Sequence, residues 1–437
     1  MLLGAGGLVA AAGWLSEQRF AFQLSPAPAA AAMPLPAYGP ETYGAAVTQA
    51  QQDVGRWRAR LEAGPNQWTR MEGLAAALLA LDRLQGTAAH SSEIDRLLET
   101  GLAAAPEPSG PTLLAAEVAL SRHDLPAVRV LLDRAEESAA PTKAERAVTA
   151  GFRGEIAFQH GSLRDAAQHF AEAADLAPGF GSQSRLAHLA LWRGDPVKAD
   201  RLAADALRTH ALPPATLARA LMMRADIAYA RGGLEAAGKH IALASARFRG
   251  APALVPYLAQ RAAAQGRWSD AIASLEAYLG THDDPEAADL LAGFHRHRGN
   301  DDDAARWSRI AGAWWDEKLR DAPDAWRLHA AEHHLDFGDP EKALRLARVE
   351  AARRPFGPAL EVLASAYTAN DRPRDALAVL DHAHAAGWRS VSLHMARAEA
   401  QQALGDRAAA DAAVKSALAL NPHADKPMRK LLRFGHY

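Results

Sequence analysis

Apolar and polar positions along the chain follow the helical period in successive stretches, and short turns separate these stretches at a nearly constant interval. Eight turn residues follow one another at spacings of 33, 38, 34, 33, 39, 33 and 34 residues: Gly161, Gly194, Gly232, Gly266, Gly299, Gly338, Asp371 and Gly405. Each of them lies between two helical stretches, and strand-like alternation is hard to find. A period of about 34 residues predicts a stacked array of helical hairpins, and therefore an all-α solenoid.

Small residues occupy two fixed positions around each turn. Seven residues before the turn stand Gly154, Ala187, Ala225, Ala259, Ala292, Ala331, Ala364 and Ala398. Five residues after the turn stand Ala166, Ala199, Ala237, Ala271, Ala304, Ala343, Ala376 and Ala410. Two antiparallel helices approach to about 8–10 Å only where the residues at their crossing point are small. The two columns therefore predict where the helices of each hairpin cross.

These positions resemble the tetratricopeptide repeat, a helix–turn–helix unit. The best single match is the series Gly154, Gly161, Ala166, Phe170, Ala173 and Pro178. The last unit matches nearly as well, with Ala398, Gly405, Ala410, Ala417 and Pro422. The resemblance covers residues 147–423 and implies eight repeats in a right-handed superhelical solenoid whose concave face is lined by the first helix of each hairpin.

The chain departs from the repeat pattern in places. The aromatic residue that usually opens the first helix is mostly missing, and two units are long. The extra residues fall around Leu212–Thr216 and Trp314–Pro323, where we expect an irregular superhelix. Upstream, residues 41–146 predict further helices with degenerate repeats, and residues 424–437 predict a basic C-terminal capping helix or tail.

The N-terminus has a different composition. Residues 1–24 begin with the apolar run MLLGAGGLVAAAGWL, which predicts a short apolar helix acting as an export signal or an anchor. The alternatives are a mis-set start codon or a loosely attached helix. Residues 25–40 are rich in Pro and Ala and predict an extended linker.

Charge and cysteine content narrow the function classes. The formal net charge is −2, so no global field favours nucleic acid or an anionic membrane. There is no cysteine, which excludes disulfides, Cys–zinc sites and thiol chemistry but leaves the compartment open. We find no phosphate-binding loop, nucleophile elbow or dinucleotide fingerprint, and we expect neither a cofactor nor catalysis.

The concave face is the predicted binding site. The residues expected to line it are Glu155, Phe158, His188, Leu191, Asp226, Tyr229, Gln260, Arg296, Glu332 and Glu399. Because acids and aromatic groups mix in this column, we expect a protein or peptide partner that bears basic residues. The alternative is that these acids are ordinary solvated positions without a ligand.

Two other clusters attract attention. Trp314 and Trp315 form a possible binding hot spot, or they fill a gap left by the long unit. His329 and His333 share a helix face, but no third ligand is evident, so we expect no metal site.

We therefore expect a non-catalytic protein–protein interaction scaffold of the bacterial cell envelope, periplasmic or anchored to the inner membrane, in an assembly or export complex. A cytoplasmic location is the alternative. A second reading is an accessory or regulatory subunit of an enzyme complex, or an enzyme whose active part lies in residues 41–146.

Overall fold

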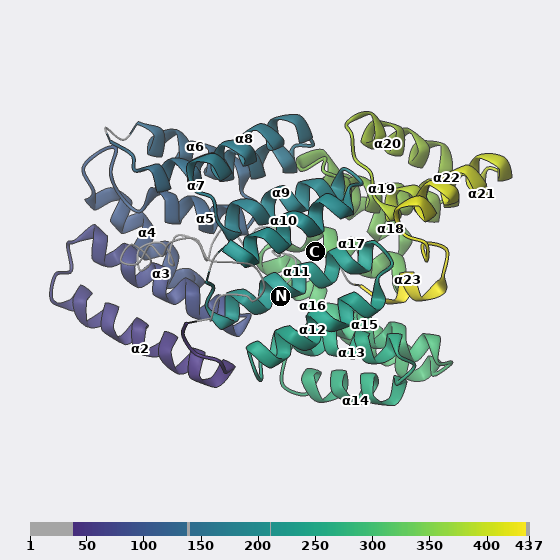
Figure 1. Ribbon diagram of the computed structural model, residues 1–437, viewed down its shortest axis with the longest axis horizontal. Coiled ribbons are helices and arrows are strands. Elements are labelled where there is room, and N and C mark those ends of the chain that lie inside the picture. The colour runs from purple at the N-terminus through teal and green to yellow at the C-terminus, as the bar shows by residue number, and fades with distance from the viewer. Residues whose placement is uncertain (1–37, 138–139, 210, 434–437) are drawn as a thin grey trace.

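The computed structural model describes residues 38–137, 140–209 and 211–433, and this part of the chain is helical throughout with no β-strand (Figure 1). The apolar run and most of the Pro/Ala-rich stretch lie outside the described residues. Within the described residues, no helix combines the length and apolar character needed to cross a membrane. Successive helices pack as antiparallel pairs, which confirms the predicted all-α solenoid.

Five helices precede the predicted repeats: α2 (Tyr43–Glu62), α3 (Trp68–Gln85), α4 (Ser91–Ala104), α5 (Thr112–Ser121) and α6 (Leu125–Glu136). The first four hairpins of the repeat region are α7 (Lys143–Gln159) with α8 (Leu163–Leu176), α9 (Phe180–Trp192) with α10 (Pro196–Thr209), α11 (Pro214–Ala230) with α12 (Leu234–Arg247), and α13 (Val255–Ala264) with α14 (Trp268–Leu279). A short 3₁₀ helix, η1 (Pro252–Leu254), leads into α13.

The last four hairpins are α15 (Pro285–His297) with α16 (Asp301–Asp321), α17 (Pro323–Asp336) with α18 (Pro340–Arg353), α19 (Gly357–Ala369) with α20 (Pro373–Ala385), and α21 (Val391–Ala403) with α22 (Arg407–Leu420). A five-residue helix, α23 (Pro427–Leu431), follows them.

The small columns pack as the sequence predicts. All sixteen positions are buried, and Ala166, Ala271 and Ala376 are fully inaccessible. A Cβ atom on Gly154 would lie 2.4 Å from a ring carbon of Phe170, so only glycine fits this crossing point. Packing of α7 on α8 therefore depends on the absence of a side chain at Gly154.

The hairpin turns share one backbone form. Every predicted turn residue except Gly338 has a positive φ angle, including Asp371 at 56°. In the first hairpin the amide of Ser162 donates to the carbonyl of Ala157, five residues back, which closes the helix in a Schellman-type cap. Gly338 is the exception, because the helix before it ends in a different geometry.

Both long units absorb their extra residues mainly by lengthening a helix. In the first, α11 has 17 residues against 13 for α9. In the second, α16 has 21 residues against 14 for α18, and Trp314 and Trp315 lie in α16.

The solenoid coils back on itself. The amide of Arg389 donates to the carbonyl of Trp192 at 2.8 Å, and the side-chain amide of Asn421 donates to the carbonyl of Tyr229 at 3.1 Å. In both places the turn within one hairpin contacts the loop that follows the fifth hairpin further along the chain: the α9–α10 turn contacts the loop after α20, and the α11–α12 turn contacts the loop after α22. We call these contacts between successive superhelical turns the inter-turn contacts.

The same register holds at the N-terminal end. Tyr43 and Arg249 are joined by a 2.9 Å hydrogen bond, and the amide of Arg249 donates to Glu41 at 3.0 Å. Since Arg249 closes the third hairpin of the repeat region, this register places α2 as the second helix of an incomplete hairpin. The degenerate N-terminal helices are therefore part of the same superhelix.

Candidate functional site

The predicted concave column is largely covered by the chain itself. Glu155, Phe158, Tyr229 and Gln260 are buried, and Arg296 is exposed. The other predicted members are half-buried: His188, Leu191, Asp226, Glu332 and Glu399. Phe158 is covered at an inter-turn contact, whereas Tyr229 and Gln260 are covered by residues near the end of the chain.

Glu155 is an internal ion-pair partner in this conformation and does not offer a free carboxylate to a groove. Its side chain lies 3.0 Å from Arg185 of α9, and both are almost fully buried. Burial raises the pKa of Glu155 to about 7, although the Arg185 guanidinium opposes the shift. The pair ties the first helices of two neighbouring hairpins together.

Phe158 and His188 belong to an aromatic cluster at an inter-turn contact. The ring of Phe158 lies 5.2 Å from that of His188 and 5.0 Å from that of Trp388 in the next superhelical turn. The indole N–H of Trp192 donates to Nε2 of His188 at 2.7 Å. Because burial disfavours the imidazolium, the pKa of His188 falls to about 4. Leu191 packs at the edge of the neighbouring core, where α9, α10 and α11 meet.

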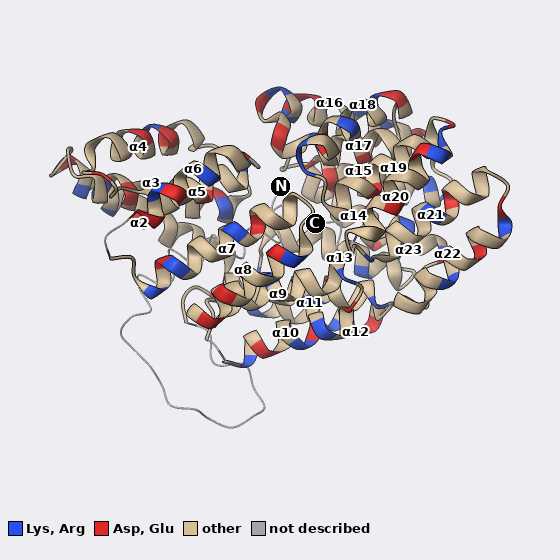
Figure 2. Cartoon of the chain, turned by 90° about the horizontal axis from the view of Figure 1, so that it is seen from above, with Lys and Arg blue, Asp and Glu red and all other residues tan. Residues whose placement is uncertain are grey.

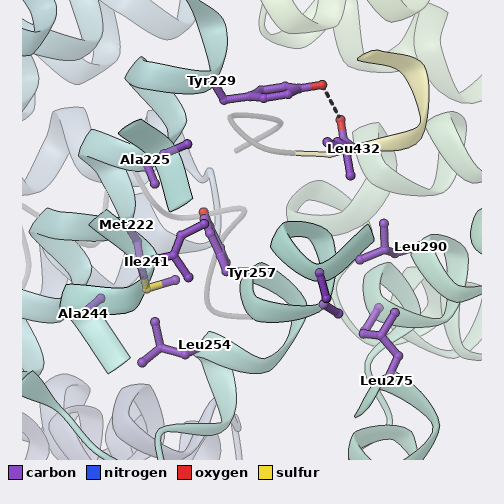
Figure 3. Packing of buried hydrophobic residues seen from close by; sticks show 14 of the residues in the cluster. Met222, Ala225, Tyr229, Ile241, Ala244, Leu254, Tyr257, Leu275, Leu290 and Leu432 are labelled. Carbon is purple, nitrogen blue, oxygen red and sulfur yellow. Dashed lines mark hydrogen bonds between the residues drawn. The ribbon is translucent and has the colours of Figure 1, made fainter. Parts of the chain in front are cut away.

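The middle of the concave face holds residues 421–433, which we call the C-terminal segment. The hydroxyl of Tyr229 lies 3.0 Å from the carbonyl oxygen of Arg429 and 3.2 Å from that of Leu432, so its single proton is shared between the two acceptors. The contact with Leu432 is drawn in Figure 3. Oε1 of Gln260 accepts a 2.6 Å hydrogen bond from the amide of Arg433. Two residues of the predicted column therefore bind main-chain atoms of the chain's own end.

Apolar contacts seat the same segment. Leu432 is only 2% exposed and belongs to the largest hydrophobic cluster, together with Tyr229 and Tyr257. Helix α23 packs against α15, where a Cβ on Gly293 would lie 3.4 Å from a methyl group of Leu431. The stretch predicted as a basic capping helix is thus reduced to one short helix that lies inside the concave face.

Charged side chains border the segment. Lys430 pairs with Glu399 at 2.5 Å, and Arg433 pairs with Asp336 at 2.5 Å. Along the helices as a whole, basic and acidic residues are interspersed (Figure 2).

The remaining members of the column make local contacts. Asp226 accepts a 3.1 Å hydrogen bond from the hydroxyl of Tyr257. Arg296 donates to the carbonyl of Asp336 at 2.7 Å, and its guanidinium stacks on Phe337. Glu332 lies 3.3 Å from His329 of the same helix.

Trp315 is a core residue and cannot act as a surface hot spot in this conformation. It is fully buried, and its indole N–H donates to Asp289 at 2.9 Å. Trp314 is half-buried and packs against the same cluster. Of the two alternatives drawn from the sequence, the one in which large side chains fill the long unit holds for Trp315.

The histidine pair of α17 is engaged by separate carboxylates. Nδ1 of His333 lies 2.6 Å from Asp289, whereas His329 lies 3.5 Å from Glu286. Among residues 38–137, 140–209 and 211–433, no group of three or more His, Asp or Glu side chains could hold a metal ion.

Buried ionisable groups in residues 41–146 make structural contacts. Asp82 accepts from the amide of His90 at 3.0 Å and pairs with its ring at 2.7 Å, which closes the loop between α3 and α4. Glu117 pairs with Arg83 of α3. Burial raises the pKa of Glu117 to about 6 against the opposing charge of Arg83.

Sequence reasoning missed the occupant of the concave face. The stretch KPMRKLLR, predicted as a capping helix or tail, carries a positive charge that is complementary to the acids predicted to line the groove. This charge complementarity is the feature of the sequence that could have indicated binding of the stretch in the groove.

These features define the fold of the protein: an α-helical solenoid of hairpins that resemble the tetratricopeptide repeat, with residues 421–433 lying in its concave face. Solved structures similar to this chain include yeast Tom70, with 14% sequence identity over 85% of this chain and 87% of that chain and a TM-score of 0.46. The APC/C hetero-tetramer Cut9–Hcn1 shows 13% identity over 90% and 83%, with a TM-score of 0.39. A tetratricopeptide repeat protein from Parabacteroides merdae shows 16% identity over 59% and 99%, with a TM-score of 0.35. No protein-family model and no curated protein sequence matches the chain.

Proposed function

We propose that the chain is a non-catalytic protein–protein interaction scaffold whose concave face binds a peptide segment of a partner protein. The observation that carries the proposal is the segment already bound there. Tyr229 and Gln260 contact main-chain atoms of that segment, and Leu432 fills an apolar site. Main-chain hydrogen bonds supply affinity and side-chain sites supply specificity when extended peptides are recognised.

Site-specific photo-crosslinking in the native host tests this proposal. A photoreactive amino acid placed at Arg296, which is exposed on a first helix, should give a discrete adduct with a partner protein. The same group at Val349 on α18, a second helix, is the matched control because that side chain is 49% exposed. Adducts at Val349 alone, or none at Arg296, would contradict binding on the concave face.

We also propose that the scaffold works at the bacterial cell envelope, in the periplasm or anchored to the inner membrane, within an assembly or export complex. The support is the sequence of residues 1–40, in which an apolar run is followed by a Pro/Ala-rich stretch. Fractionation of the native protein tests this location. Recovery in the cytosolic fraction only would contradict it.

A further inference from the structure

The C-terminal segment differs from the hairpins in how it is held. Each hairpin packs through columns of buried small residues, whereas the segment contains one five-residue helix and, beyond the inter-turn residue Asn421, only two buried side chains, those of Ala424 and Leu432. The side chains of Tyr229 and Gln260 contact main-chain atoms of the segment, which another chain could present equally well.

The charged contacts of the segment are open to solvent on at least one side. The side chain of Lys430 is 66% exposed and that of Glu399 is 39% exposed, while Asp336, the partner of Arg433, is 48% exposed. Solvent-exposed ion pairs contribute little to stability, although they select for charge. These pairs thus favour a basic occupant without fixing it permanently.

The site also retains unused hydrogen-bonding capacity. Gln260 is completely buried, and its Nε2 donor has no hydrogen-bond partner among residues 38–137, 140–209 and 211–433. Nε of Arg429, in the segment itself, is likewise buried without a partner. A buried donor without an acceptor costs free energy, so an occupant that offers a carbonyl to Gln260 would satisfy the site better than the present segment does.

We propose that residues 421–433 are a displaceable ligand of the concave face formed by α11, α13 and α15. This inference rests on the proposed function. It assigns the partner a chemistry, a segment with a short helical turn and leucine flanked by basic residues, as in Lys430–Arg433. The partner binds by replacing the chain's own segment, so the intact protein is self-blocked. Because the segment follows α22 directly in the same chain, its binding is intramolecular, with an effective concentration on the order of mM that a partner must overcome.

The test uses the full chain and a labelled synthetic peptide of residues 421–433, with binding measured by fluorescence anisotropy. Leu432→Asp in the chain places a charge in the apolar site and should release the segment. That variant should bind the peptide at least about tenfold more tightly than the unmodified chain, because the tethered competitor is gone. A peptide carrying the same Leu432→Asp change should fail to bind.

Two further variants make the test specific. Leu404→Asp, at a side chain already 41% exposed, should leave peptide binding as weak as in the unmodified chain. Adding Tyr229→Phe to the Leu432→Asp chain should weaken peptide binding, because it removes the hydroxyl that contacts the segment. Circular dichroism establishes that each variant is folded. If Leu432→Asp impairs folding, charge reversal of Lys430 and Arg433 in the chain provides the released form.

A folded, released chain that does not bind the peptide would overturn the inference and identify the segment as a fixed cap. Equal peptide binding with and without Tyr229→Phe would contradict the assignment of the peptide to the site beside Tyr229. Neither result removes the proposed function, which fails separately if photo-crosslinking finds no partner on the concave face.

Discussion

Two glycines with the same backbone conformation isolate the inter-turn contact from the hairpin turn itself. Gly194 and Gly266 both have a φ of 76° and both follow the first helix of a hairpin. A Cβ on Gly194 would lie 2.8 Å from Cβ of Arg389, whereas a Cβ on Gly266 would have no atom within 4 Å. Changing either glycine to alanine therefore adds the same backbone strain, but only the change at Gly194 also produces a steric clash.

The magnitude follows from these two terms. The left-handed conformation costs a non-glycine residue about 1–2 kcal/mol, and this term is common to both variants. Carbon atoms prefer a separation of about 3.5–4.0 Å, so the contact at Arg389 must open. Overpacking of this kind costs about 1–3 kcal/mol more. The backbone of Arg389 cannot withdraw without weakening its hydrogen bond to Trp192.

Urea unfolding followed by circular dichroism, together with hydrogen exchange at the amide of Arg389, measures both terms. Gly194→Ala should lower the unfolding midpoint further than Gly266→Ala and should accelerate exchange at Arg389. The exchange readout matters because a solenoid can open locally before it unfolds globally. Equal effects of the two substitutions would refute the claim that the superhelical turns are in contact.

Three further outcomes follow from the packing and the charges. Ala271→Leu should cost about 1–3 kcal/mol in urea unfolding by overpacking a helix crossing, while Ala412→Leu on an exposed face should be nearly silent. Glu155→Leu should cost about 3–5 kcal/mol in the same assay, because it removes the carboxyl that accepts a hydrogen bond from the buried Arg185 guanidinium; an unchanged midpoint would contradict the buried pair. His188 has a native pKa of about 4 against about 6.5 when unfolded, so the unfolded state takes up the proton first. Its contribution should be complete above pH 6.5 and lost as the pH falls towards 4, by at most about 3 kcal/mol, and His188→Gln should flatten this part of a stability–pH profile.

Local features of the chain were predictable from the sequence. The left-handed turn residues and the small crossing residues act within one hairpin, so Gly161 and Ala166 mark their positions without knowledge of the rest of the fold. Gly338 shows the limit of this reasoning, since the residue type matches the pattern while its backbone does not. A repeated spacing in the sequence predicts where the turns lie more reliably than it predicts the backbone conformation of each turn.

The curvature of the superhelix was not predictable in this way. It accumulates from small rotations between neighbouring hairpins, and two long units change those rotations. Phe158 lies on a first helix, as expected, but its ring contacts Phe356 and Trp388, in loops that return about two hundred residues later. Gln159 and Arg354 are hydrogen-bonded across the same gap, with a separation of 195 residues. The bound C-terminal segment depends on the same curvature, because the acids that meet Lys430 and Arg433 come from different hairpins.

Occupation of the concave face by the chain's own end is the central claim, and zero-length carbodiimide crosslinking of the unmodified protein tests it most directly. Lys430 and Glu399 lie 2.5 Å apart with both side chains open to the reagent, so mass spectrometry should recover a crosslink between them. Lys342 and Asp316, 2.7 Å apart in neighbouring hairpins, provide the internal control. Recovery of both crosslinks is the predicted result. Recovery of the control crosslink without the one between Lys430 and Glu399 would contradict the account.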